Sequence, residues 1–315
     1  MGSTYVVMKS VRCNHQALVS TFITMRCGSC CCFAFAAVGL MLMFAAHVRA
    51  AERVKEYEDF QAGNFDNSTV IDSEWMPLKP GTRYIWDGLT VDEEGDVESR
   101  SVVFTVTDLT KVIDGVRTVV CSERDIVDGE LEETEILFAA QDNDGTVWLL
   151  GEYPEEYDGK QFLGAPCWIH GVKDAQAGIM MLAEPKLRTP SYSQGWAPSV
   201  EFSDRGVVYQ VDQNTTVPYG SFDEVLIIDE FNDEEPDAHQ LKYFARGVGI
   251  VRVGWQGEVT DQETLELIKV EQISSEELAR VRDEALKLEK RAYEISQDVY
   301  AHTKPSERIG YNEEE

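Results

Sequence analysis

Residues 101–121 read SVVFTVTDLTKVIDGVRTVVC, and this stretch contains the pattern that decides the fold class. Val102, Phe104 and Val106 fall on one face of an alternating segment, which is typical of a β-strand with one buried face. Asp114-Gly115 separates this segment from a second apolar run at residues 118–121. Asp-Gly between two such runs is a strong hairpin signal, because Gly accepts the positive φ of a tight turn. The stretch therefore predicts two antiparallel strands joined by a short turn.

The same combination of a short apolar run and a turn recurs along the chain. Further runs stand at residues 83–86, 135–138, 147–150, 207–211, 225–228, 241–244, 250–253 and 265–270. About ten short strands with few helical stretches between them predict a mainly β fold, either an antiparallel sandwich or a half-barrel. We place this β-domain at residues 75–273, after an acidic and aperiodic segment at residues 51–74.

Residues 274–303 have a different period and predict an amphipathic α-helix. Ser274 and Glu277 have the spacing of a capping box, and apolar residues then recur at steps of three and four. These seam residues are Leu278, Val281, Ala285, Leu288, Ala292, Ile295 and Val299. Two interpretations stay open: the helix lies on the β-domain, or its seam pairs with a second copy or another protein. Lys304-Pro305 ends the helix, and we expect residues 304–315 to be a disordered acidic end.

The first 50 residues have the pattern of a secretory signal peptide. They contain no Asp or Glu, and basic residues precede an uncharged run at residues 27–46. Small or β-branched residues then stand before a cleavage position after Ala50. The run is also long enough to span a bilayer, so an N-terminal anchor is the alternative. We expect a secreted or periplasmic protein, or else a membrane-anchored one with the β-domain outside the cytoplasm.

The charge of the chain excludes one class of partner. The formal net charge is −29 over 315 residues. Nucleic-acid binding needs clustered Lys and Arg, so we expect no nucleic-acid partner. Contact with a membrane is expected only if the leader is retained, because anionic lipid headgroups repel an acidic domain.

Seven cysteines are distributed unevenly between the leader and the rest of the chain. Five of them lie in the leader, so Cys121 and Cys167 remain in the β-domain. In an oxidising compartment these two form either one disulfide or two buried thiols. Cys167 and His170 are also the least implausible nucleophile and base, although three residues apart on a strand they point to opposite faces.

Residues 142–145 read DNDG and resemble part of a calcium loop. With Gly145 at the glycine position of an EF-hand, Ala140 and Gly151 fall where the first and last ligands belong. We therefore predict a turn between two strands and no metal site. No other motif indicates catalysis or a cofactor: the chain lacks a nucleophile elbow, a His-Glu-x-x-His sequence and a phosphate-binding glycine loop. We expect a protein that is not an enzyme.

Four short stretches occur in a recognisable order. They are residues 77–84 (PLKPGTRY), 140–148 (AQDNDGTVW), 217–225 (VPYGSFDEV) and 243–249 (YFARGVG). Together they resemble an uncharacterised family of secreted bacterial β-rich domains, over roughly residues 75–272. The resemblance implies a curved antiparallel sheet or half-barrel, distantly similar to periplasmic lipoprotein-carrier domains, and no catalytic residues. The C-terminal helix is not part of that pattern.

Three hypotheses for function follow. The leading one is an exported binding or envelope protein that holds an apolar ligand against aromatic residues of a half-barrel; the alternative for those residues is a closed core. The candidate ligand-binding residues are Tyr84, Trp86, Phe104, Trp148 and Trp168. The second hypothesis is an interaction module that associates with itself or another protein through the helix at residues 278–299. The third is a hydrolase with an unrecognised acidic site.

Overall fold

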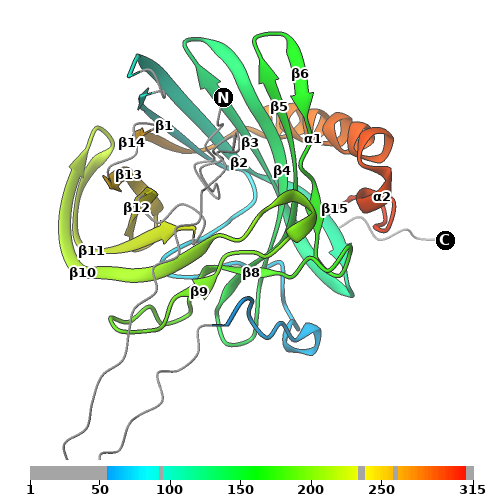
Figure 1. Cartoon of the computed structure of the whole chain (residues 1–315), viewed down its shortest axis with the longest axis horizontal. Helices are drawn as coiled ribbons and strands as arrows, with labels where there is room; N and C mark the ends of the chain where they lie inside the picture. Colours follow the sequence, from blue (N-terminus) through cyan, green and yellow to red (C-terminus); the bar gives the residue numbers. More distant parts are fainter. Residues whose placement is uncertain (1–54, 92–94, 233–237, 258–261, 310–315) are drawn as a thin grey trace, which may run out of the picture. The chain divides into compact units, whose positions relative to one another are not determined.

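A computed structural model describes residues 55–91, 95–232, 238–257 and 262–309. The predicted signal peptide or anchor at residues 1–50 lies outside these residues. The prediction of a mainly β, antiparallel fold with a C-terminal helix is confirmed: one large sheet accounts for all strands of the described part (Figure 1).

The sheet has two arms that meet where the first and last long strands pair. One arm comprises β1 (Thr82–Val91), β2 (Val97–Ile113), β3 (Val116–Val127), β4 (Glu130–Gln141), β5 (Val147–Asp158) and β6 (Gln161–Gly164). The other comprises β10 (Arg205–Val217), β11 (Gly220–Phe231), β12 (Ala238–Ala245), β13 (Gly249–Gly257) and β14 (Gln262–Gln272). The order along the sheet is β6-β5-β4-β3-β2-β1-β14-β13-β12-β11-β10-β9, so each arm is a meander of neighbouring antiparallel strands.

Tight Asp-Gly turns join β2 to β3 and β3 to β4, and they fix the strand pairing next to each turn. Asp114 and Gly115 have φ of 45° and 83°, and they join β2 to β3 with Ile113 opposite Val116. Asp128 and Gly129 have similar values and join β3 to β4. Both residues of such a turn need positive φ, which Asp tolerates and Gly adopts freely. The predicted hairpins are confirmed at both places.

The two arms curl toward each other, and their facing sides share one apolar core. We call the shared side the interior face; it carries Phe104 of β2, Leu226 of β11 and Leu265 of β14. Three short strands close the gap between the arm ends: β7 (Trp168–Ile169) and β8 (Gly178–Met181) pair with β5, and β9 (Tyr192–Ser193) pairs with β10. A bridge between Gln176 and Trp196 links the two sides.

The closure depends on a close backbone approach at Gly178. A Cβ atom on this residue would lie 1.9 Å from the carbonyl carbon of Gln194, so a side chain does not fit there. The ring of Trp168 also stacks on Phe202, with centroids 5.4 Å apart, across the same gap. Because the curl is closed in this way, the aromatic residues of the interior face lie in a packed core.

Helix α1 (Ser275–Ile295) packs on the outer face of the first arm, against β2 and β4. The predicted capping box is present: Ser274 Oγ accepts from Glu277 N, and the Glu277 carboxylate accepts from Ser274 N. Arg291 Nε donates to both carboxylate oxygens of buried Glu155 on β5, at 2.7 and 2.9 Å. A shorter helix, α2 (Gln297–Tyr300), follows.

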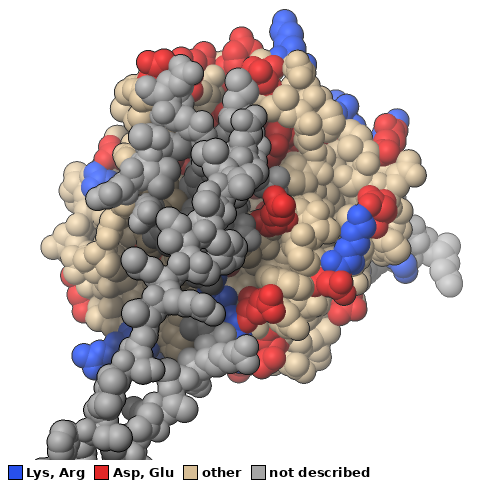
Figure 2. Space-filling view, viewed as in Figure 1, with Lys and Arg blue, Asp and Glu red and all other residues tan. Residues whose placement is uncertain are grey.

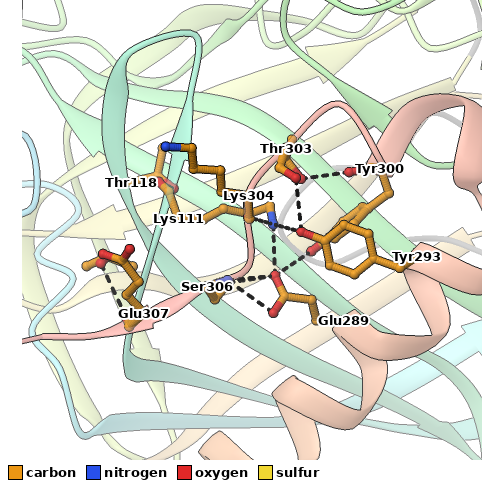
Figure 3. A network of polar contacts seen from close by, with 10 residues as sticks. Lys111, Thr118, Glu289, Tyr293, Tyr300, Thr303, Lys304, Ser306 and Glu307 are labelled. Atoms are coloured by element: carbon orange, nitrogen blue, oxygen red, sulfur yellow. Dashed lines mark hydrogen bonds and ion pairs between the residues drawn. The ribbon is translucent and has the colours of Figure 1, made fainter. Parts of the chain in front are cut away.

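A buried lysine fixes the helix to the sheet (Figure 3). Lys111 Nζ of β2 lies 2.8 Å from Glu289 Oε1 of α1 and 2.7 Å from the Lys304 carbonyl oxygen, and its side chain is fully buried. Tyr300 and Ser306 donate to the same Glu289 carboxylate. This network orders the chain beyond the helix, which continues into β15 (Glu307–Arg308) paired with β2. The expectation of disorder from residue 304 is therefore wrong for residues 304–309; residues 310–315 lie outside the described part.

The seam of the helix mostly faces its own sheet. Ala285, Leu288, Ala292 and Val299 are buried, Leu278 and Val281 are partly buried, and Ile295 is exposed. This arrangement corresponds to the first of the two interpretations, in which the helix lies on the β-domain.

Candidate ligand-binding interior

The interior face is divided into an apolar zone and a carboxylate zone. Alternation along β2 continues from Val106, Phe104 and Val102 to Arg100, where the side chains change from apolar to charged. The carboxylate zone consists of buried acidic residues on both arms. Its members are Glu123, Asp125, Glu133, Glu135, Glu152, Asp204, Glu230 and Glu263.

The strand register sets acidic residues directly opposite one another. Glu123 of β3 pairs with Glu135 of β4, and Asp125 pairs with Glu133. Like charges at directly opposed positions destabilise a sheet. In most folds, the residue at each position stabilises the structure around it. Two opposed acidic pairs on a buried face do not, and such exceptions are typical of functional sites.

Arg100 and Lys242 are basic side chains of the same zone. Arg100 forms ion pairs with Asp125 and with Glu263, the latter at 3.5 Å, and its side chain is 2% exposed. Lys242 of β12 forms an ion pair with Glu230 of β11 and is fully buried. The Gln194 side-chain amide also donates a hydrogen bond to the Glu230 carboxylate at 2.6 Å, so this carboxylate has a hydrogen-bond donor in addition to its ion pair.

Two carboxyl groups of the zone have strongly raised pKa values. Burial, and then the charge of Asp125, raises the pKa of Glu123 to about 8, while Lys242 opposes the shift. Burial, and then the charge of Glu230, raises the pKa of Asp204 to about 8, and Lys242 again opposes the shift. Glu152 also contributes to the raised pKa of Asp204. These interactions join strands of both arms, so the zone is one cluster that spans the interior.

Glu123 Oε2 and the Tyr192 hydroxyl are buried polar atoms of this region that have no hydrogen-bond partner among the residues that the structure describes. Glu123 is 2% exposed and Tyr192 is 4% exposed. Buried polar groups are hydrogen-bonded in most proteins, so each exception calls for an explanation. Glu123 is the clearer case, because a carboxylate in the interior needs a positive charge or a donor.

The five aromatic residues predicted to bind an apolar ligand do not form one site. Tyr84, Trp86 and Phe104 lie together, with Tyr84 stacked on Trp86 at 5.7 Å, and they line a crevice of about 30 Å³. That volume has room for about one water molecule and not for a lipid.

The other two aromatic residues lie elsewhere. Trp168 stacks on Phe202 and donates to Glu152 at 2.9 Å. Trp148 packs against Phe60 and donates to Asp142 at 2.9 Å. All five are buried, which corresponds to the closed-core alternative for these residues.

Cys121 and Cys167 are both free and buried, so the structure contains two buried thiols in place of a disulfide between them. Cys121 stands on the interior face of β3 beside Glu135 and Glu123, whereas Cys167 precedes β7 near Asp298 of α2.

Burial raises the pKa of both thiols well above the ordinary value. His170 accepts from Ala177 N at 3.0 Å, and burial lowers its pKa. A protonated thiol is a poor nucleophile, so the Cys167 and His170 pair gains no support.

Residues 142–145 form a turn, as predicted. Asp142 Oδ1 accepts from Asp144 N and Thr146 N, and Gly145 has φ of 94°. The side chains of Asn143 and Asp144 contact the preceding segment through Asp66 and Asn64. Within the described ranges, no group of three His, Cys, Asp or Glu side chains is arranged to hold a metal ion.

The part of the face in Figure 2 that the described residues form shows no acidic patch that competes with this zone. Acidic side chains are spread over the face seen in Figure 2, with Lys and Arg between them, and they do not gather in one patch. The interior carboxylates were missed by sequence reasoning, because their pairing depends on an irregularity of the strands. The Asp128-Gly129 turn by itself places Asp125 opposite Glu132 and Glu123 opposite Thr134, and a register shift next to Asp125 brings Glu133 and Glu135 to these positions instead.

Comparisons with known proteins give only distant similarities. No family model and no curated protein matches the chain. A crystal structure of a proposed exported protein with a YmcC-like fold from Bacteroides fragilis is 12% identical, with a TM-score of 0.34; the match covers 63% of this chain and 99% of that one. A proposed lipoprotein from Parabacteroides distasonis is 12% identical, with a TM-score of 0.33, over 64% of this chain and all of the other. Neither of these two is described as a lipoprotein-carrier domain.

The helices that the structure describes include none that is both long and apolar enough to span a membrane.

Proposed function

We propose that this chain is an exported, non-enzymatic binding protein that holds a positively charged ligand in its interior. The proposal of export rests on the signal-peptide pattern of residues 1–50. The proposal of binding rests on the carboxylate zone and replaces the apolar ligand expected from sequence, because the aromatic residues are divided among three places and packed.

One observation supports this function above the others. Glu123 is 2% exposed, stands directly opposite Glu135, and has a carboxylate oxygen without a hydrogen-bond partner among the described residues. A cationic group placed between the two strands offers Glu123 both a donor and a countercharge, so its binding favours the ionised carboxylate over the protonated acid. Charge-assisted hydrogen bonds are the stronger kind. An anionic ligand meets repulsion at the same position.

A panel of three ligand classes tests the proposal by isothermal titration calorimetry. Spermine, citrate and palmitate represent cationic, anionic and apolar ligands. We expect binding of spermine, weakened at least tenfold by Glu123→Gln. Glu276→Gln, which changes an exposed carboxylate on α1, is the matched control and leaves the affinity unchanged. Absence of spermine binding, or equal binding of citrate, contradicts the proposal.

The hydrolase alternative has one observation in its favour. Glu123 has a pKa of about 8, while the neighbouring Asp125 carboxylate is paired with Arg100. A protonated and an ionised carboxyl group in one site is the arrangement used by acid–base hydrolases. Turnover of a glycoside or ester panel, abolished by Glu123→Gln and retained by Glu276→Gln, is the result that this alternative requires.

A further inference from the structure

The carboxylate zone extends across several strands and is not centred on one point. Glu123, Glu135 and Glu152 stand on the consecutive strands β3, β4 and β5. Neighbouring strands are about 4.8 Å apart, so these three positions span two spacings, or about 10 Å. The chain also lacks, in its described ranges, a group of ligands arranged around one metal position.

The zone continues onto the opposite arm. Asp204, which precedes β10, interacts electrostatically with Glu152 of β5 and with Glu230 of β11. Lys242 of β12, on the second arm, acts electrostatically on both Glu123 and Asp204. The acidic positions therefore form a path across the interior, with a lysine ammonium already accommodated on it. This shows that the zone can hold an alkylammonium group in the buried state.

Apolar side chains flank the carboxylates of this path. Phe104 stands opposite Glu123 on the neighbouring strand, and Leu137 stands opposite Glu152. On the second arm, Ile228 and Val253 stand opposite Lys242 on either side. Methylene chains pack on such apolar surface while their charged groups remain with polar partners, as lysine side chains do.

We propose that the ligand is an extended chain of alkylammonium groups, in which amines contact carboxylates on successive strands and the methylene linkers lie on the apolar side chains that flank them. The inference rests on the proposed function and specifies the ligand class of the same site. The Glu123 oxygen without a hydrogen-bond partner indicates where one amine of the ligand binds. This observation does not depend on how many acidic residues the zone contains. Free polyamines and the lysine side chains of a basic peptide share this chemistry.

Two trivalent cations of different shape test the inference. Spermidine and hexamminecobalt(III) carry the same charge, but the first is extended and the second is compact. We measure the affinity of the full chain for each by isothermal titration calorimetry at one ionic strength. We expect spermidine to bind at least tenfold more tightly, and Glu123→Gln to reduce that preference at least fivefold. Glu276→Gln leaves it unchanged, and circular dichroism checks that both variants fold.

The outcomes separate the two proposals. Equal affinity for the two cations overturns the extended-chain inference and leaves the proposed function standing, because charge alone then explains binding. If neither cation binds, both the extended-chain inference and the proposed function are overturned. Trilysine distinguishes the sources: tighter binding of trilysine than of spermidine supports a basic protein segment, and the reverse supports a free polyamine.

Discussion

Glu123 on β3 and Lys242 on β12 interact across the interior, although β2, β1, β14 and β13 stand between their strands in the sheet. This electrostatic interaction exists because the two arms curl until their inner faces meet. Lys242 lowers the pKa of Glu123 against the effect of burial, and it also forms an ion pair with Glu230. A single ammonium group therefore couples both arms of the fold.

Replacing this ammonium group is expected to destabilise the protein. Lys242→Met leaves the Glu230 carboxylate buried without its ion pair, and breaking a buried pair from one side costs about 3 to 5 kcal/mol. Urea unfolding at neutral pH measures the loss. Lys269→Met, which removes an exposed ion pair with Glu271, is the control and should change stability by less than about 1 kcal/mol. Equal losses in the two variants contradict a stabilising role for the buried pair of Lys242 and Glu230.

Stability should fall as the pH rises. The folded protein has pKa values of about 8 at Glu123 and Asp204, whereas the unfolded chain has values of roughly 4 at both. The folded state thus retains protons that the unfolded state releases. This stabilising contribution is complete below about pH 4 and is lost as the pH rises through about 8. The free energy of unfolding should decrease over this window, by at most about 1.4 kcal/mol per pH unit for each group.

Glu123→Gln tests this pH dependence, because glutamine resembles the protonated acid and does not titrate. Urea unfolding over the same pH window should show a shallower slope for this variant than for the unchanged chain. Glu276→Gln should keep the original slope. Identical slopes in all three proteins show that Glu123 titrates normally.

The helix should be part of the cooperative fold. Lys111→Met leaves the Glu289 carboxylate buried without its cation, so a loss of about 3 to 5 kcal/mol is expected. Hydrogen exchange followed by mass spectrometry should show that Lys111→Met speeds exchange, relative to the unchanged chain, more in residues 275–309 than in β3 and β4. Lys55→Met, at an exposed ion pair with Asp59, should leave both measurements unchanged. A stable variant with normal exchange indicates that α1 is held mainly by its apolar seam.

Closure of the sheet should depend on Gly178. In Gly178→Ala, the new methyl group meets the backbone of Gln194 at 1.9 Å, which the flanking strands can relieve only by separating. Overpacking of a core typically costs about 1 to 3 kcal/mol, and backbone contact places this variant at the upper end. The midpoint of urea unfolding measures the effect. Gly63→Ala has no atom within 4 Å of the added Cβ and serves as the control.

Both thiols should be unreactive in the folded protein. Burial raises the pKa of Cys121 and Cys167, and the thiolate is the reactive form. Iodoacetamide at mildly alkaline pH, followed by peptide mass spectrometry, should leave both cysteines unmodified in the native state and modify both in urea. A peptide in which the two are joined contradicts the assignment of free thiols.

The amino-acid sequence by itself determined the local structure. Alternation at Val102, Phe104 and Val106, the Asp114-Gly115 turn and the Ser274 and Glu277 capping box each depend on neighbours close along the chain. Their geometry therefore follows from residue type and spacing. The pairing of β3 with β4 was also available from the Asp128-Gly129 turn, but the register shift next to Asp125 that places Glu123 opposite Glu135 was not.

Only the tertiary structure decided which faces meet. Alternation shows that Glu123 and Phe104 lie on one side of the sheet, but not that this side faces Lys242 across a curled interior. The aromatic residues looked like a ligand surface because sequence gives their face and not the packing that covers it. Likewise, the helix seam was compatible with a partner until Lys111 and Glu289 placed it on the outer face of β2. Long-range packing depends on the shape of the whole sheet, and that shape is not encoded in any short stretch of the chain.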